Sequence, residues 1–73
     1  MYCWIQVDRE YWYGPLHDGR MTIRERVARV WKADDSPNEW QWEGAGRRGR
    51  EKSFESAKRA AEEAVKAATD QEQ

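Results

Sequence analysis

Aromatic and β-branched residues are concentrated at the start of the chain. Residues 2–7 contain four such residues together with Cys3, and this apolar run predicts a strand. Successive side chains of a strand point to opposite faces, so Cys3, Ile5 and Val7 share one face. We expect Cys3 to be a small core hydrophobe, as free cysteines usually are. After a charged triplet, three consecutive aromatic residues at 11–13 indicate a short second strand.

The pattern over residues 21–33 fits two structures. Thr22 and Glu25 have the spacing of a helical capping box, and the apolar positions that follow also suit a helix over 22–32. The second half instead leads through a five-residue, turn-forming link at 34–38 into residues 39–44, where polar residues alternate with tryptophan. That arrangement is typical of a β-hairpin. We therefore interpret 21–33 and 39–44 as strands, with the helix as the alternative for 22–32.

The end of the chain predicts an amphipathic helix over residues 53–69. Ser53 is a suitable N-cap, and Glu55 in the first turn complements the helix dipole. One side of this helix is lined mainly by alanine, so it can lie close to a sheet on which Trp40 and Trp42 supply the volume. We expect residues 70–73 to fray.

These elements predict one α+β domain spanning residues 1–73. The expected architecture is an antiparallel three- to four-stranded sheet packed on one face by a C-terminal helix, in the order β-β-β-α. The dipeptides Gly14-Pro15 and Asp18-Gly19 predict the turns of the loop between the second and third strands.

Composition narrows the classes of function. Hydrophobic residues make up 38% of the chain and charged residues 37%, with five tryptophans and a net charge of −1. This balance argues against a strongly basic nucleic-acid binder and against a uniformly acidic mimic of DNA. A single cysteine excludes an intramolecular disulfide, and we see no signal peptide or long apolar run. We therefore expect a reduced, cytoplasmic protein with no membrane partner.

A basic, glycine-rich segment follows the predicted hairpin. Residues 44–49 match the letters of the G-x-G-x-x-G dinucleotide fingerprint. That fingerprint requires a turn that opens directly into a helix within a βαβ unit, whereas here three residues intervene and no strand follows. We expect a flexible, solvated strand-to-helix loop. Its Arg47, Arg48 and Arg50 are candidate contacts for phosphates or for acidic groups of a partner.

Catalytic and metal-binding groups are scarce. The one histidine, His17, lies in the predicted loop, and nothing in the sequence pairs it with Cys3 as a nucleophile would require. One histidine and one cysteine cannot complete a closed zinc site. Turn chemistry accounts for Asp34 and Asp35. We expect a protein that is not an enzyme and holds no cofactor or metal.

The aromatic surplus is the strongest functional signal. Tyr11, Trp12 and Tyr13 are consecutive, so at least one of them must face away from the core of an extended chain. Tyrosine and tryptophan beside arginine are typical of protein-interface hot spots. Stacking on nucleobases is a second use of such residues, and covering the edge of a small core is a third.

Two resemblances add to this interpretation. Residues 39–68 are similar in outline to the double-stranded-RNA-binding domain, but that family begins with a helix and nothing before Trp12 predicts one, so no activity is transferred. Residues 27–31, 40–42, 44–46 and 53–58 resemble small phage and prophage proteins in which a tryptophan-rich β-meander precedes a helix. Proteins of this size and type include anti-CRISPR and other anti-defence inhibitors, which generally act by occluding a surface.

The resemblance implies a small inhibitor that binds and blocks a protein or ribonucleoprotein complex. We expect Tyr11, Trp12 and Tyr13 to be apolar anchors, and Arg47, Arg48 and Arg50 to meet acidic groups of the partner. The alternative is a nucleic-acid-binding module that uses the same arginines. A homodimer formed through an exposed sheet edge is a third possibility.

Overall fold

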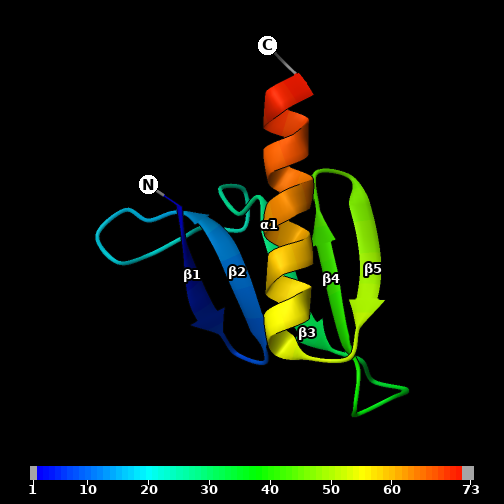
Figure 1. Ribbon diagram of the computed structural model, residues 1–73. Coiled ribbons are helices and arrows are strands. Elements are labelled where there is room, and N and C mark those ends of the chain that lie inside the picture. The colour runs from blue at the N-terminus through cyan, green and yellow to red at the C-terminus, as the bar shows by residue number, and fades with distance from the viewer. Residues whose placement is uncertain (1, 72–73) are drawn as a thin grey trace.

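The computed structural model describes residues 2–71, and these form one antiparallel sheet with one helix (Figure 1). The elements are β1 (Tyr2–Val7), β2 (Glu10–Pro15), β3 (Ala28–Lys32), β4 (Trp40–Gly44), β5 (Arg47–Glu51) and α1 (Phe54–Gln71). Neighbouring strands in the chain are neighbours in the sheet, in the order β1-β2-β3-β4-β5. Helix α1 packs on one face, over β3, β4 and β5.

The α+β class and the C-terminal helix on an antiparallel sheet are confirmed, but the sheet has five strands rather than three or four. The expectation of a flexible loop after residue 44 was wrong, because Arg47–Glu51 forms the edge strand β5. Ala45 and Gly46 both have positive φ, at 52° and 78°, so these two residues suffice for a tight hairpin turn. The G-x-G-x-x-G letters therefore fold as a hairpin rather than as a strand-to-helix turn.

The segment 21–33 combines both interpretations of its sequence. Only Ala28–Lys32 is a strand, so the expected strand over 21–33 was too long. Before it, the amides of Glu25 and Arg26 donate to the Thr22 carbonyl and form a single helical turn. The Thr22 amide donates to the Glu25 carboxylate at 3.0 Å, as in a capping box. The helix ends after one turn because Val27 donates to the Tyr13 carbonyl, which joins the chain to the sheet.

Two other local predictions, the turn at Asp18-Gly19 and the link at 34–38, are confirmed. Asp18 and Gly19 form the turn between the paired residues His17 and Arg20. Residues 34–38 link β3 to β4, and the Ala33 amide donates to the Glu39 carbonyl across this link. Strand β2 runs from Glu10 to Pro15, so the expected strand over 11–13 was too short. The predicted turn at Gly14-Pro15 was wrong, because both residues pair with β1 as the end of β2. Helix α1 continues to Gln71, so the expected helix over 53–69 ended too early and residues 70–71 are helical instead of frayed. Residues 72–73 of the expected tail lie outside the described part of the chain.

The core lies between α1 and the sheet. Ala57 and Ala61 of the helix and Val30 of β3 are all 0% exposed. Aromatic rings surround them, including Tyr11, Trp40 and Trp42. This packing of sheet aromatics against an alanine-lined helix was predicted from the sequence. The helix begins at the expected cap, where the hydroxyl of Ser53 accepts a hydrogen bond from the Ser56 amide at 3.1 Å.

Two glycines lie at close contacts around this core. A Cβ on Gly44 would lie 3.4 Å from the Ala61 carbonyl oxygen, so the helix passes directly over the end of β4. A Cβ on Gly49 would lie 2.8–2.9 Å from the indole of Trp42, on the facing position of β4. The indole of Trp42 thus lies flat over the edge strand only because residue 49 has no side chain.

We expect Ala45→Asn to stabilise the protein by about 0.5–1 kcal/mol, because asparagine tolerates the left-handed conformation that alanine adopts there at a cost. Urea unfolding followed by tryptophan fluorescence measures the change. Ala45→Val should move the free energy of unfolding the other way. Equal stability of the two variants would show that this turn does not limit the stability of the hairpin.

We expect Gly49→Ala to destabilise the fold by about 1–3 kcal/mol, because the added methyl group displaces the Trp42 indole from under the helix. Arg48→Ala, at the exposed neighbouring position, is the control and should change stability by less than about 0.5 kcal/mol. Thermal unfolding of both variants tests the packing, and a neutral Gly49→Ala would contradict it.

Candidate functional site: the open face of the sheet

The face of the sheet opposite α1 is the candidate site, and we call it the open face. Strand alternation and register place these side chains on it: Ile5, Val7, Glu10, Trp12, Arg29, Trp31, Gln41, Glu43, Arg48 and Arg50. Within residues 2–71, the segment 21–26 covers only one end, where a Cβ on Gly14 would lie 2.8 Å from the Glu25 carbonyl oxygen. No helix or strand of the described residues packs on the centre of the face.

A cluster of two tryptophans, two arginines and one carboxylate occupies the middle of the open face. The guanidinium of Arg26 lies 4.8 Å from the ring centroid of Trp12, and that of Arg29 lies 4.2 Å from that of Trp31. Glu10 connects the two stacks, and we call these five residues the Trp–Arg cluster. Each stack is a cation–π interaction that holds an aromatic ring and a positive charge in a fixed relation.

Glu10 is the electrostatic centre of the cluster. Its carboxylate accepts a hydrogen bond from the Trp12 indole nitrogen at 2.9 Å and one from Arg29 Nη1 at 3.2 Å. Arg26 Nη1 lies 3.6 Å away. One negative charge thus orients two arginines and one indole, which leaves the cluster with a net positive charge.

The surface is hollowed on both sides of the Glu10–Arg29 pair. One hollow, of about 560 Å³, is lined by Val7, Trp12 and Ile23 among others, and Ile23 is 61% exposed. The other, of about 540 Å³, is lined by residues that include Trp31 and Pro37. Apolar side chains and cations are therefore interspersed on this surface. Its hollows can receive the side chains of a partner.

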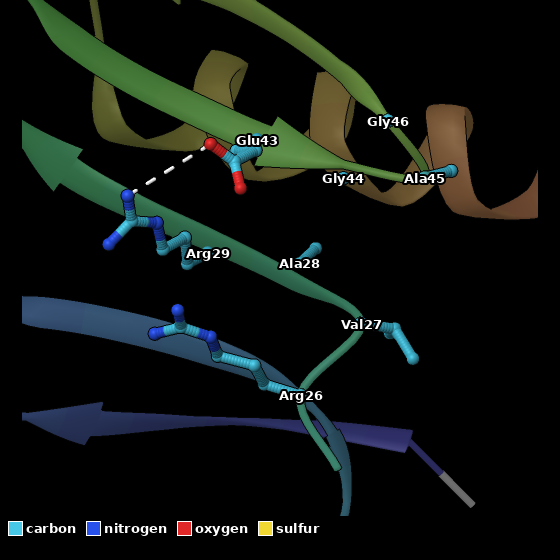
Figure 2. Close-up of a pocket in the computed structure, with 8 residues that line it drawn as sticks. All are labelled: Arg26, Val27, Ala28, Arg29, Glu43, Gly44, Ala45 and Gly46. Carbon is cyan, nitrogen blue, oxygen red and sulfur yellow. Dashed lines mark ion pairs between the residues drawn. The ribbon is translucent and has the colours of Figure 1, made fainter. Parts of the chain in front are cut away.

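A smaller hollow of about 200 Å³ lies where β3 leaves the 21–26 turn and β4 reaches its hairpin (Figure 2). Figure 2 shows the side chains of Arg26 and Arg29 next to one another, both directed along the sheet, with α1 behind it. Arg29 Nη2 lies 3.9 Å from the carboxylate of Glu43 on β4. The Nε of Arg29 is buried and has no hydrogen-bond partner among the described residues.

The structure separates the three consecutive aromatics. Trp12 lies on the open face, which confirms that at least one of them faces away from the core. Tyr11 and Tyr13 lie on the helix face, where their rings pack against Phe54 at 4.5 Å and Trp4 at 4.9 Å. Burial raises the pKa of the Tyr13 phenol, and the nearby Glu62 carboxylate raises it further. These two tyrosines are therefore placed in the core rather than on the open face.

The three arginines of β5 are also divided between faces. Arg48 and Arg50 are on the open face, opposite Glu43 and Gln41, whereas Arg47 lies opposite Gly44 and points to the other side. Arg50 forms ion pairs with Asp35 at 3.3 Å and Glu39 at 3.8 Å. Arg48 is exposed and forms no ion pair with any residue from 2 to 71.

Glu10, Arg26, Arg29 and Trp31 were not predicted as site residues from the sequence. Arg29 and Trp31 alternate with the buried Val30 along β3. This alternation could have indicated that the sheet face opposite Val30 carries polar and aromatic side chains. Their meeting with Trp12 and Glu10 depends on the register between β2 and β3, which the sequence pattern does not specify.

The remaining titratable candidates lie at the margin of the open face. His17 pairs with Glu25 at 2.7 Å in the exposed loop. Hydrogen bonds from the backbone and the side chain of Thr22 lower the pKa of the Glu25 carboxyl, and His17 adds to this effect. Cys3 is half-buried on the open-face side of β1, so its expected place in the core was wrong. Among the described residues, no three histidine, cysteine or acidic side chains gather as metal ligands do.

Comparison of the chain with known protein families, curated proteins and solved structures finds no match. In the described part of the chain, α1 is too polar to cross a membrane. The geometry of the open face therefore provides the best indication of function.

We expect Glu10→Ala to destabilise the protein by about 1–2 kcal/mol, because it leaves two neighbouring arginines and an indole without their shared acceptor. Glu63→Ala removes an exposed carboxylate from α1 and serves as the control, with an expected change below about 0.5 kcal/mol. Urea unfolding of the two variants measures the difference. Equal losses would show that Glu10 does not organise the cluster.

Proposed function

We propose that this protein is a small, non-catalytic binding protein that uses its open face to cover a surface on a protein or ribonucleoprotein complex. The observation that carries the proposal is the Trp–Arg cluster, in which Trp12 and Trp31 lie on the sheet face opposite α1. Among residues 2–71, only the turn at 21–26 packs on this face, at one end. Tryptophan and arginine are the residues most enriched at interface hot spots.

The cluster suits protein recognition because it is already ordered. Two cation–π stacks and the bonds to Glu10 hold the side chains in place, so less rotamer entropy is lost on binding. With Arg26 and Arg29 around a single carboxylate, the complementary surface would combine apolar side chains with acidic groups. Arg48 would extend this positive charge toward β5.

The dimensions of the molecule support action by occlusion. The chain is a slab with extents of 35 × 29 × 17 Å. Its broad side is comparable to the roughly 800 Å² per partner that a standard specific interface buries. The resemblance of the chain to small phage proteins gives this activity its expected setting, as an anti-defence inhibitor of the anti-CRISPR type in the cytoplasm of a host cell.

Direct binding of nucleic acid is the second candidate. The exposed Arg48 beside Arg50 favours it, because arginines and aromatics on a sheet can hold a single strand. Two features favour the protein partner instead. Arg26 and Arg29 each occupy one face of a tryptophan ring that a base would need, and Glu10 and Glu43 offset part of the positive charge.

Salt dependence distinguishes the two candidates. We expect labelled duplex and single-stranded DNA and RNA to show no tight binding, and any weak binding to fall steeply between about 50 and 200 mM salt. Arg48→Ala tests the edge-strand arginine, and Arg59→Ala on the exposed side of α1 is its matched control. Micromolar binding that Arg48→Ala abolishes and Arg59→Ala leaves intact would favour the nucleic-acid function.

The protein interface is tested by affinity purification of the tagged protein from bacterial cells. We expect a complex that survives moderate salt and that Trp12→Ala and Trp31→Ala each weaken at least about tenfold, equivalent to about 1.4 kcal/mol. Arg59→Ala should leave it unchanged, and circular dichroism confirms the fold of each variant. A complex that neither tryptophan variant weakens would place the interface elsewhere.

A further inference from the structure

The sheet has two edge strands, β1 and β5, and the hairpin pairings show which of their backbone N–H and C=O groups point away from the sheet. Val7 and Glu10 flank a two-residue turn and so form a hydrogen-bonded pair. The alternation of an antiparallel ladder then directs the N–H and C=O groups of Tyr2, Trp4 and Gln6 outward. Tyr13, opposite Trp4, confirms this phase, because its carbonyl turns away from β1 and accepts the Val27 amide at 2.7 Å.

Edge strand β5 is protected against pairing with a copy of itself. By the same alternation, the outward backbone groups of β5 belong to Arg48 and Arg50. A second β5 paired antiparallel through these groups would place Arg48 of one copy opposite Arg50 of the other. Like charges directly opposite one another destabilise a strand pair.

Edge strand β1 has no such protection. Its six residues carry no charge and include neither glycine nor proline. The described residues pair with β1 only along the β2 side, which leaves its outer edge without a strand partner. In Figure 1, β1 is the leftmost strand, and the loop after β2 projects past its upper end. Tyr2 on this strand is 47% exposed. A strand of this composition with an unpaired edge is a template for another strand.

We propose that two copies of the protein associate through antiparallel pairing of their β1 strands, with Trp4 at the two-fold axis. In this register Tyr2 of one copy lies opposite Gln6 of the other, and Cys3 lies opposite Ile5. All the outward groups of β1 are then satisfied by about six backbone hydrogen bonds. The two sheets join into one continuous sheet.

The side chains of β1 fit a second copy on both faces. On the open face, the apolar Cys3, Ile5 and Val7 of each copy form one uncharged strip across the junction. On the helix face, the two Trp4 rings meet beside the helices that hold them through Glu62. Because β1 can pair with itself and β5 cannot, association stops at a closed dimer instead of continuing into a fibre. The proposal does not depend on the function of the open face.

A disulfide tests the register directly. In Ile5→Cys, the new thiol faces Cys3 of the other copy in a non-hydrogen-bonded pair, where Cα atoms are about 4.5 Å apart and a disulfide can form. In wild type and in Val7→Cys, the nearest thiols across the junction are diagonal, about 7–8 Å apart. After treatment with diamide, we expect Ile5→Cys to give a covalent dimer on non-reducing electrophoresis at least about tenfold faster than either control. Equal cross-linking of the three proteins would overturn the register.

Sedimentation tests the association itself. The wild type should sediment at about twice the monomer mass of 8.7 kDa and dissociate on dilution. Gln6→Pro removes an outward N–H from β1 and should give a monomer, whereas Arg50→Pro makes the matching change on β5 and should remain a dimer. Circular dichroism verifies that both variants fold. A monomeric wild type at every concentration, or a dimer that only Arg50→Pro disrupts, would overturn the proposal.

Discussion

The structure depends on the close contact between an alanine-lined helix and one face of the sheet. Ala57 and Ala61 are fully buried, and the absence of longer side chains lets the helix backbone approach β4 at Gly44. The volume of the core comes from the sheet, whose aromatic rings fill the space on both sides of the helix. A chain of 73 residues with few aliphatics can form a core in this way because each ring removes a large area from water.

This contact also determines which aromatics remain for other uses. The helix covers one face of the sheet, so the strand alternation that places Tyr11 and Tyr13 beneath it places Trp12 on the opposite face. Trp31 is directed to that face in the same way by the burial of Val30. The open face is thus aromatic as a consequence of the register of β2 and β3, and its arginines stabilise the rings by stacking on them.

The short turn at residues 22–26 shows how the sheet limits a local preference. The capping-box bond between Thr22 and Glu25 forms as it would in a helix. The turn then ends because Val27 gains a hydrogen bond to Tyr13 and the following residues enter β3 between two other strands. Its position over Gly14 brings Arg26 onto Trp12, so this turn contributes one of the two stacks of the open face.

The sequence by itself determined the elements that depend on neighbouring residues. These are strand β1, the Asp18-Gly19 turn, the 34–38 hairpin link, the Ser53 cap and the amphipathic helix. Only the tertiary structure decided that Arg47–Glu51 is a strand, because arginine and glycine favour strands weakly and pairing with β4 supplies the stability. The Trp–Arg cluster was likewise decided by register, since Glu10 and Arg29 are far apart in sequence and meet only when β2 pairs with β3. The local pattern specifies which side chains of a strand lie on the same face. The pairing between distant strands specifies which side chains of other strands lie beside them.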